Sequence, residues 1–275
     1  MIEFCFESIN WSPYFGVENP DLPRLVHAAG GAGFDWISFD EKLLDAYRAG
    51  GESYASLRRL LDDEGLRTLA IHSAALGDDA LAAVSDCKPL AEAAAALDAP
   101  YLQVGGVAPL GEALFEATSA AARVAREANA ALAIEFIPFL EIASIEQTRR
   151  LLRSAEAEGS GIVVDCWHIF HGPDGPAELE TLSSSEIAFI QFDDHPPLVG
   201  DDLLSETTQR RVYPGDGVFD LPSFAEAIRS TGFDGVVGLE LLSAAHRELA
   251  VEDVARDLLA ASRRYWSDPV PPASR

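Results

Sequence analysis

The stretch GIVVDCWH, residues 161–168, is a short apolar run that ends in an aspartate and is followed three positions later by a histidine. The run is continuously apolar rather than alternating, which is typical of a parallel strand covered on both faces. Seven similar runs occur along the chain, at residues 2–6, 35–39, 67–71, 101–105, 132–136, 187–192 and 236–240. Together these runs predict eight parallel strands.

Alanine- and leucine-rich segments with the periodicity of amphipathic helices separate these runs. Several of the segments end in glycine shortly before the next run, as in DDEGLRT at residues 62–68, and this is a helix-termination signal. Eight strand–helix units predict an α/β protein with a single-domain (β/α)8 TIM barrel at residues 1–268 and a flexible C-terminal tail at residues 269–275. A doubly wound open sheet is the alternative, but residues 5–13, CFESINWSP, lack its glycine-rich fingerprint.

The composition excludes several classes of function. The chain carries 45 acidic and 20 basic residues, a formal charge of −25, which disfavours binding to nucleic acid or to anionic membranes. No run approaches the roughly 18 apolar residues of a membrane span, and the N-terminus lacks a basic region followed by an apolar one. The three cysteines do not suggest a disulfide framework. We therefore expect a cytoplasmic protein that acts on a small molecule, and a homodimer is a candidate assembly.

Polar residues end four successive predicted strands, and these residues are Glu135, Asp165, Gln191 and Glu240. The carboxyl ends of parallel barrel strands face one shared pocket, so these side chains should lie close together. A single acid at such a position is commonly a helix cap, but three carboxylates in one pocket repel unless some are protonated or a cation lies among them. Oxygen ligands suit one Mg²⁺ or Mn²⁺ ion better than a structural zinc. Cys166, next to Asp165, is expected in the core.

Three further residues are candidates for the pocket. His168 lies where the sixth predicted strand turns into a helix, although a histidine bonded to a backbone carbonyl would explain it equally well. Arg211 precedes a Pro-Gly turn within residues 195–220, a segment too long for a plain connection. Its alternative interpretation is a surface arginine in a polar loop. His72 ends the third predicted strand and is expected to line the pocket.

Five short motifs in this order resemble the xylose isomerase-like TIM barrel superfamily: EFIP (135–138), VVDCWH (163–168), FIQFDD (189–194), RRVYPGDG (210–217) and GLELLS (238–243). This group contains sugar and sugar-phosphate isomerases and epimerases, hydroxypyruvate isomerase and some dehydratases. The resemblance implies that one divalent metal ion is bound by four side chains, those of Glu135, Asp165, Gln191 and Glu240. It also implies that His168 and Arg211 contact the substrate. Glutamine at position 191, where many epimerases have histidine, resembles the hydroxypyruvate isomerase and 3-dehydroshikimate dehydratase branch.

The resemblance implies a metal-dependent isomerase or epimerase of a small keto sugar or related hydroxy-carbonyl compound, acting through a metal-stabilised enediolate. Glu135 and Glu240 would take a carbon-bound proton and return it, while His168, Arg211 and His72 would bind the polyhydroxy carbonyl substrate. The alternative is a dehydratase, that is a lyase, of a keto polyol or keto acid such as an inosose or 3-dehydroshikimate. The long loop favours that branch, whereas the apolar residues after Glu135 do not.

Two other functions receive less support from the sequence. Endonuclease-like hydrolysis would require several metal ions and a basic groove, and the charge of −25 argues against it. A sugar-binding barrel without catalytic activity should have lost one of the four ligand positions, and all four are present.

Overall fold

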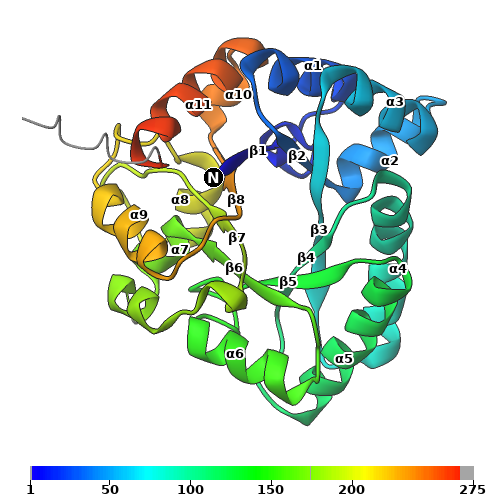
Figure 1. Ribbon diagram of the computed structural model, residues 1–275, viewed down its shortest axis with the longest axis vertical. Coiled ribbons are helices and arrows are strands. Elements are labelled where there is room, and N and C mark those ends of the chain that lie inside the picture. The colour runs from blue at the N-terminus through cyan, green and yellow to red at the C-terminus, as the bar shows by residue number, and fades with distance from the viewer. Residues whose placement is uncertain (1, 174, 267–275) are drawn as a thin grey trace, which may run out of the picture.

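A computed structural model describes residues 2–173 and 175–266 and shows a closed barrel of parallel strands inside a ring of helices (Figure 1). In these residues the strands follow one another around the barrel in sequence order, and the first pairs with the eighth to close it. They are β1 Glu3–Glu7, β2 Trp36–Asp40, β3 Arg67–Leu76, β4 Tyr101–Gly106, β5 Ala131–Glu135, β6 Gly161–Asp165, β7 Ile187–Gln191 and β8 Val236–Leu239. The predicted single-domain (β/α)8 barrel is confirmed. The predicted tail at 269–275 lies outside the described residues.

Helices follow the strands, and most of them form the outer layer. They are α1 Leu22–Ala32, α2 Glu41–Ala49, α3 Tyr54–Glu64, α4 Ala80–Leu97, α5 Glu112–Glu127, α6 Ile145–Ser154, α7 Cys166–His171, α8 Leu203–Gln209, α9 Leu221–Ser230, α10 Ala244–Arg247 and α11 Val251–Trp266. Short 3₁₀ helices are η1 Ser8–Trp11, η2 Pro13–Phe15, η3 Gly175–Thr181 and η4 Ser184–Glu186. Within the described ranges no helix is both long enough and apolar enough to cross a membrane.

The strand side chains that point into the barrel form two layers, one above the other along the barrel axis. Successive strand residues point to opposite faces, so a residue two positions before a strand end shares the face of that end. Apolar residues occupy these earlier positions and pack in a separate cluster, which includes Cys5, Ala133, Val163 and Phe189. The polar residues two positions later are Glu7, Glu135, Asp165 and Gln191. A layer of apolar side chains therefore fills the barrel beneath the layer of polar side chains.

The third strand is longer than the sequence predicted. It extends to Leu76, so His72 lies within β3 and not at its end. The strand continues because Ala75 and Leu76 pair with Gly105 and Gly106 of β4, after a register shift that follows His72. His72 itself faces Asp40 of β2 and Gln103 of β4 in the register of the sheet.

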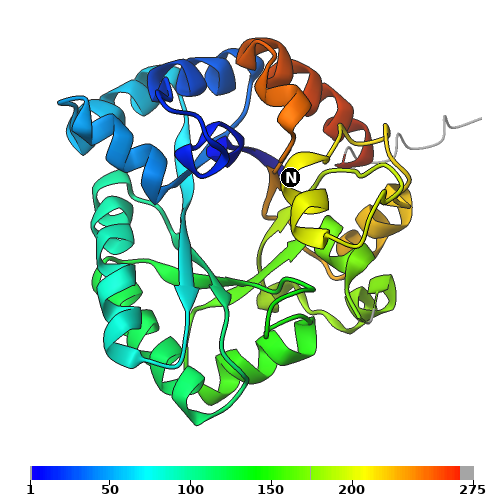
Figure 2. The ribbon, with the colours of Figure 1, turned by 180° about the vertical axis from the view of Figure 1, so that it is seen from behind.

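The long segment after β7 is anchored to the barrel by Asp194. The carboxylate of Asp194 accepts hydrogen bonds from the backbone N–H groups of Gly215, Gly217 and Phe219, at 2.9, 3.0 and 3.1 Å. A Cβ atom at position 217 would lie 2.2 Å from Asp194 Oδ1, so only glycine fits there. Seen from behind, the yellow helix α8 and the dark blue turns after β1 lie inside the ring of helices, and other parts of the yellow segment reach the edge of the ring beside α11 (Figure 2). The Pro-Gly turn thus fixes how this segment returns to the barrel.

An ion pair on the outer wall gives a testable stability difference. Arg149 of α6 contacts Glu186 with Nε–Oε1 at 2.6 Å, and this hydrogen bond lowers the pKa of Glu186 from 4.5 to about 2. Glu186→Gln should lower the free energy of unfolding at pH 7 by about 1 kcal/mol, because the pair is partly exposed. A lowered folded-state pKa stabilises the protein above pH 4.5, and the gain is lost as the pH falls towards 2.

Urea denaturation at pH 7 and pH 3 measures this difference, which should be smaller at pH 3. Glu158→Gln, at an exposed glutamate, is the matched control and should change little at either pH. An equal loss for Glu186→Gln at both pH values would contradict the assignment.

Candidate active site

The predicted site residues meet at the end of the barrel where the strands finish. A pocket of about 360 Å³ opens there, lined by His72, Glu135, His168, Arg211 and Glu240 together with apolar and small side chains. Asp165 and Gln191 are fully buried and contact members of this group. The seven residues selected from the sequence therefore come together. Their roles as ligands and substrate contacts remain predictions.

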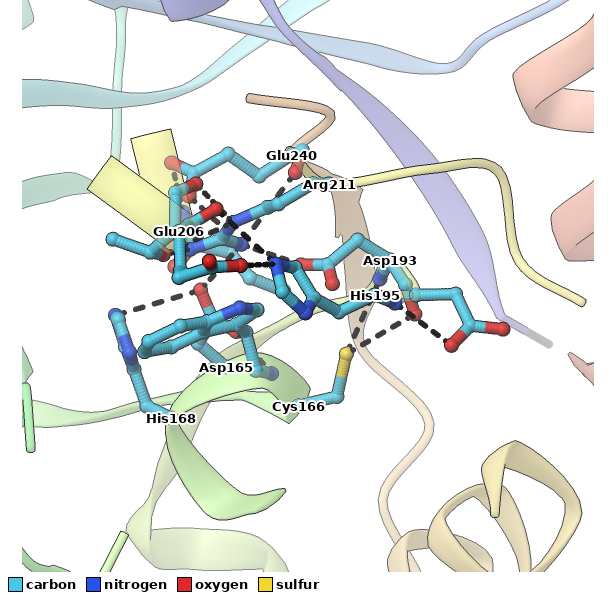
Figure 3. A network of polar contacts seen from close by, with 12 residues as sticks. Asp165, Cys166, His168, Asp193, His195, Glu206, Arg211 and Glu240 are labelled. Atoms are coloured by element: carbon cyan, nitrogen blue, oxygen red, sulfur yellow. Dashed lines mark hydrogen bonds and ion pairs between the residues drawn. The ribbon is translucent and has the colours of Figure 1, made fainter. Parts of the chain in front are cut away.

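Arg211 occupies the centre of the polar layer and is 1% exposed. Its Nη1 lies 2.9 Å from Asp165 Oδ2 and 3.2 Å from Glu240 Oε2, and it also contacts Asp193 (Figure 3). Its Nε and Nη2 donate to the backbone oxygen and to the hydroxyl of Thr207 in α8, at 3.0 and 2.8 Å. The backbone N–H of Arg211 donates to Leu242, two residues beyond Glu240. Arg211 is thus a buried counter-ion and not the surface arginine of the alternative interpretation.

Glu135, the last residue of β5, is held from two sides. Gln103 Nε2 donates to Glu135 Oε2 at 2.9 Å, and His168 Nε2 lies 2.9 Å from Glu135 Oε1. The same nitrogen of His168 lies 3.6 Å from Asp165 Oδ2, so this histidine bridges two strand ends. Among the described residues no backbone carbonyl accepts a hydrogen bond from His168, so the alternative interpretation of this histidine is wrong.

Asp165 combines two roles. Its Oδ1 accepts the backbone N–H of Trp167 at 2.6 Å and caps α7, as a lone strand-end acid often does. Its Oδ2 faces Arg211 and His168 instead. Burial alone would raise the pKa of Asp165, but the charges of Arg211 and His168 lower it below the usual value. Capping therefore uses one oxygen and leaves the other for the pocket.

Gln191 and Glu240 are the remaining two of the four predicted ligands. Gln191 Nε2 donates to Glu240 Oε1 at 2.9 Å, which leaves Gln191 Oε1 without a partner among the described residues although it is buried. Burial raises the pKa of Glu240 well above its usual value, and the neighbouring carboxylates of Glu135 and Asp165 add to this effect in spite of Arg211. Burial and neighbouring negative charge therefore both disfavour the ionised form of Glu240.

These observations fit a divalent cation. Three buried carboxylates, those of Asp165, Asp193 and Glu240, share one guanidinium, and a fourth, that of Glu135, contacts His168. Atoms offered by Glu135, Asp165 and His168 all lie within 4.8 Å of one another. The buried oxygen of Gln191 is an acceptor with no donor, as a metal ligand would be. The donors are mostly oxygens, which suit a hard ion.

A second group of ligand atoms within 4.8 Å contains Asp165, Cys166 and Asp193. Cys166 starts α7, and its Sγ contacts the backbone oxygen and N–H of Asp193 at 3.3 and 3.2 Å. Burial raises the pKa of this thiol well above its usual value, so it stays protonated and is a poor ligand. Cys166 is fully buried among apolar side chains, as the sequence predicted, although it lies close to Asp165.

The sequence assigned no role to two side chains of the site, although one of them, Gln103, lies near the end of an early strand. Asp193 is the first acid of FIQFDD and contacts Arg211, while burial raises its pKa well above the usual value. Gln103 orients Glu135 from the neighbouring strand. The only sequence signal was a polar residue in an otherwise apolar strand at 103 and a doubled acid after β7. Neither pattern indicates a partner, because both partners are distant in the chain.

A sequence profile of the family described as "Xylose isomerase-like TIM barrel" matches residues 26–265. The chain is similar to 3-dehydroshikimate dehydratase of Pseudomonas aeruginosa, with 27% identity over 248 residues that cover 81% of this chain and 36% of that protein. It is also similar to inosose isomerase of Halalkalibacterium halodurans, with 24% identity over 135 residues that cover 48% of this chain and 47% of that protein. The chain thus spans less than half the length of these relatives.

Among solved structures, the fold is similar to that of the IOLI protein with a bound zinc atom. The TM-score is 0.80 at 19% identity, and the match covers 96% of this chain and 98% of that one. Identity at this level shows a common fold and nothing more specific.

Removal of the central guanidinium should destabilise the protein strongly. Arg211→Met removes the guanidinium beside the buried carboxylates of Asp193 and Asp165 and leaves Asp165 with His168 alone, which should cost about 3–5 kcal/mol of unfolding free energy. Chemical denaturation in the presence of a chelator measures the loss. The control is Arg153→Met, an arginine 65% exposed, which should cost less than about 1 kcal/mol. Similar losses for the two variants would show that Arg211 is not the charge on which the site depends.

Proposed function

The chain belongs to the xylose isomerase-like TIM barrel family, and from this premise we propose that it is a divalent-metal-dependent isomerase or epimerase of a small keto sugar or related hydroxy-carbonyl compound. The family relatives are isomerases, epimerases and dehydratases that act on polyhydroxy carbonyl compounds. The observation that carries the proposal is the buried amide of Gln191, which donates to Glu240 and whose Oε1 has no partner among the described residues, in a site where ligand atoms of Glu135, Asp165 and His168 lie within 4.8 Å of one another.

Glu135, Asp165, Gln191 through Oε1, and Glu240 would hold the metal ion. When bound, the ion would polarise the substrate carbonyl and stabilise the negative charge that develops when a neighbouring carbon loses its proton. Oxygen donors favour Mg²⁺ or Mn²⁺. Arg211 keeps Asp165 and Glu240 close together in spite of their mutual repulsion.

Glu135 and Glu240 are the proposed acid and base. Glu135 ends β5 and Glu240 directly follows β8, so the two carboxylates approach the pocket from different strands. Gln103 and His168 orient the first carboxylate, and Gln191 orients the second. One carboxylate takes the proton from carbon, and a carboxylic acid returns it to the same carbon in epimerisation or to the adjacent carbon in isomerisation. His168, His72 and Arg211 line the same pocket and are the proposed substrate contacts.

Dehydration of a keto polyol or keto acid is the second candidate. The specific observation in its favour is the match to a 3-dehydroshikimate dehydratase over 81% of this chain. Both reactions begin with removal of a proton next to a carbonyl, and they differ in whether a hydroxyl then departs as water. The same carboxylates serve either reaction, so the site residues alone do not separate the two.

The electrostatics of the pocket favour an uncharged substrate. Among the described residues that line it, the cationic groups are Arg211 and two histidines, and Arg211 already contacts three carboxylates. A substrate carboxylate or phosphate would therefore find no free guanidinium or ammonium group. The walls are largely apolar, with Val104, Ile137, Leu204 and Leu242 among them. A neutral keto polyol such as an inosose suits this pocket better than 3-dehydroshikimate or a sugar phosphate.

Metal binding tests the ligand set directly. After removal of bound metal with a chelator, the protein should bind one Mn²⁺ per chain, measured by calorimetry and elemental analysis. Gln191→Leu removes one ligand oxygen and should weaken Mn²⁺ binding by about tenfold or more. Gln191→His keeps a ligand at the position and should retain binding but shift the preference towards Zn²⁺. Unchanged Mn²⁺ affinity in Gln191→Leu would remove this glutamine from the ligand set.

Proton exchange tests the chemistry whichever product forms. With Mn²⁺ in D₂O, keto sugars, inososes and 3-dehydroshikimate are compared by incorporation of deuterium at carbon, and we expect exchange with an uncharged compound. Glu135→Gln and Glu240→Gln should each slow exchange by about 100-fold or more. Glu141→Gln, an exposed glutamate in the loop after β5, is the control and should have no effect. A lyase would also produce a conjugated enone that absorbs in the near ultraviolet. Full exchange in both active-site variants would contradict the acid and base assignment.

A further inference from the structure

A second pair of titratable groups lies in the same polar layer as the proposed metal ligands, on β1, which pairs with β8, and on β3. Glu7 ends β1, and its side chain is fully buried. Neither of its oxygens has a hydrogen-bond partner among the described residues. His72 Nε2 lies 3.4 Å from Glu7 Oε2. Burial of a carboxylate with so few favourable contacts lowers the stability of the folded protein. Such groups are concentrated at functional sites.

Gly238 in β8 leaves the space that the Glu7 carboxylate occupies. A Cβ atom at Gly238 would lie 2.3 Å from Glu7 Oε1, so any side chain at this position would displace Glu7. Gly238 pairs with Cys5 of β1 and with Gln191 of β7. A glycine in the interior of a strand weakens the strand, and here it leaves space for an acid.

His72 connects this pair to the pocket. The side chain of His72 is 4% exposed and lines the pocket, and its Nε2 has no hydrogen-bond partner among the described residues. Because Nε2 is the ring nitrogen nearest Glu7, Nδ1 remains for a ligand in the pocket. The ring therefore lies between a buried acid and the space that the substrate would occupy.

We propose that Glu7 and His72 form a proton-transfer dyad for the substrate oxygen, in which His72 is the catalytic residue and Glu7 is its positioning residue. This assignment rests on the proposed function of the same pocket. It adds a residue to the reaction, since Glu135 and Glu240 exchange the carbon-bound proton and leave the oxygen-bound proton unassigned.

The proton transfer between His72 and the substrate needs no further reactant. As a carboxylate takes the proton from carbon, the N–H bond of the His72 imidazolium breaks and an O–H bond forms on the substrate carbonyl oxygen. In isomerisation, the neighbouring hydroxyl then returns a proton to His72 as its oxygen becomes the new carbonyl. In epimerisation, the same oxygen returns the proton. The ring ends in its starting state in both cases.

The groups around His72 favour the protonated ring that this step requires. Burial alone would lower the pKa of His72, but Glu7 on β1, Asp40 on β2 and Glu135 on β5 raise it above the usual value. Gln103, the facing residue on β4, is neutral. Asp40 is held through Oδ1, which accepts from Ser12 and from the backbone N–H of Leu43, while its Oδ2 has no hydrogen-bond partner among the described residues.

The variants Glu7→Gln and His72→Gln test the dyad on the Mn²⁺-loaded full chain. With the substrate found by deuterium exchange, each should lower kcat by about 100-fold and change KM less than about threefold. In Glu7→Gln the high-pH limit of activity should move to lower pH, since the ring loses its proton more easily. His27→Gln, at an exposed histidine, is the control and should leave kcat unchanged. The Mn²⁺ affinity should be the same in all of these variants, which separates the dyad from the metal ligands.

NMR of histidine-labelled protein gives a readout without substrate. The His72 ring should titrate at lower pH in Glu7→Gln than in the wild type, and Glu7→Asp should restore part of the difference. The inference fails if Glu7→Gln leaves either the His72 titration or kcat unchanged. The proposed function fails separately, if the wild-type protein exchanges no carbon-bound proton in any compound.

Discussion

The structure depends on how buried negative charge is balanced at the end of the barrel. Asp165, Asp193 and Glu240 surround a single guanidinium nitrogen of Arg211, and the pKa values of Asp193 and Glu240 remain raised in spite of it. One guanidinium is not sufficient for this number of carboxylates. The long segment after β7 is placed to supply that one charge, because Asp194 fixes its Pro-Gly turn and Thr207 of α8 holds the arginine in place. The remaining deficit is the physical reason to expect a divalent ion.

The barrel divides the polar layer into two walls with different chemistry. On β5 to β8 the side chains offer oxygens that converge on one another and on Arg211. On β1 to β3, Glu7 and His72 face each other with few other partners. The proposed metal site on one wall and the proposed proton-transfer dyad on the other would both act on the carbonyl oxygen of the substrate. The layer of apolar side chains beneath the two walls excludes bulk water from that side. This exclusion strengthens the electrostatic interactions of the polar side chains.

Properties that depend on the local sequence could be predicted well. The eight apolar runs match the observed strands within about one residue at most ends, and Glu135, Asp165 and Gln191 are the last residues of their strands. Continuous apolar runs and strand alternation are sufficient for this. β3 was predicted too short because its extension depends on pairing with Gly105 and Gly106, which lie in a different strand. Asp193, Gln103 and the pairing of Glu7 with His72 could not be predicted for the same reason. Each depends on a partner brought in by barrel closure or by the return of a long segment.

Anomalous X-ray diffraction from crystals grown with Mn²⁺ tests the central claim most directly. We expect one strong anomalous peak, bounded by carboxylate oxygens of Glu135, Asp165 and Glu240 and by Oε1 of Gln191, with Arg211 still buried beside it. A peak at the Asp165, Cys166 and Asp193 group, or a protein that takes up no Mn²⁺ at the four strand ends, would contradict this account.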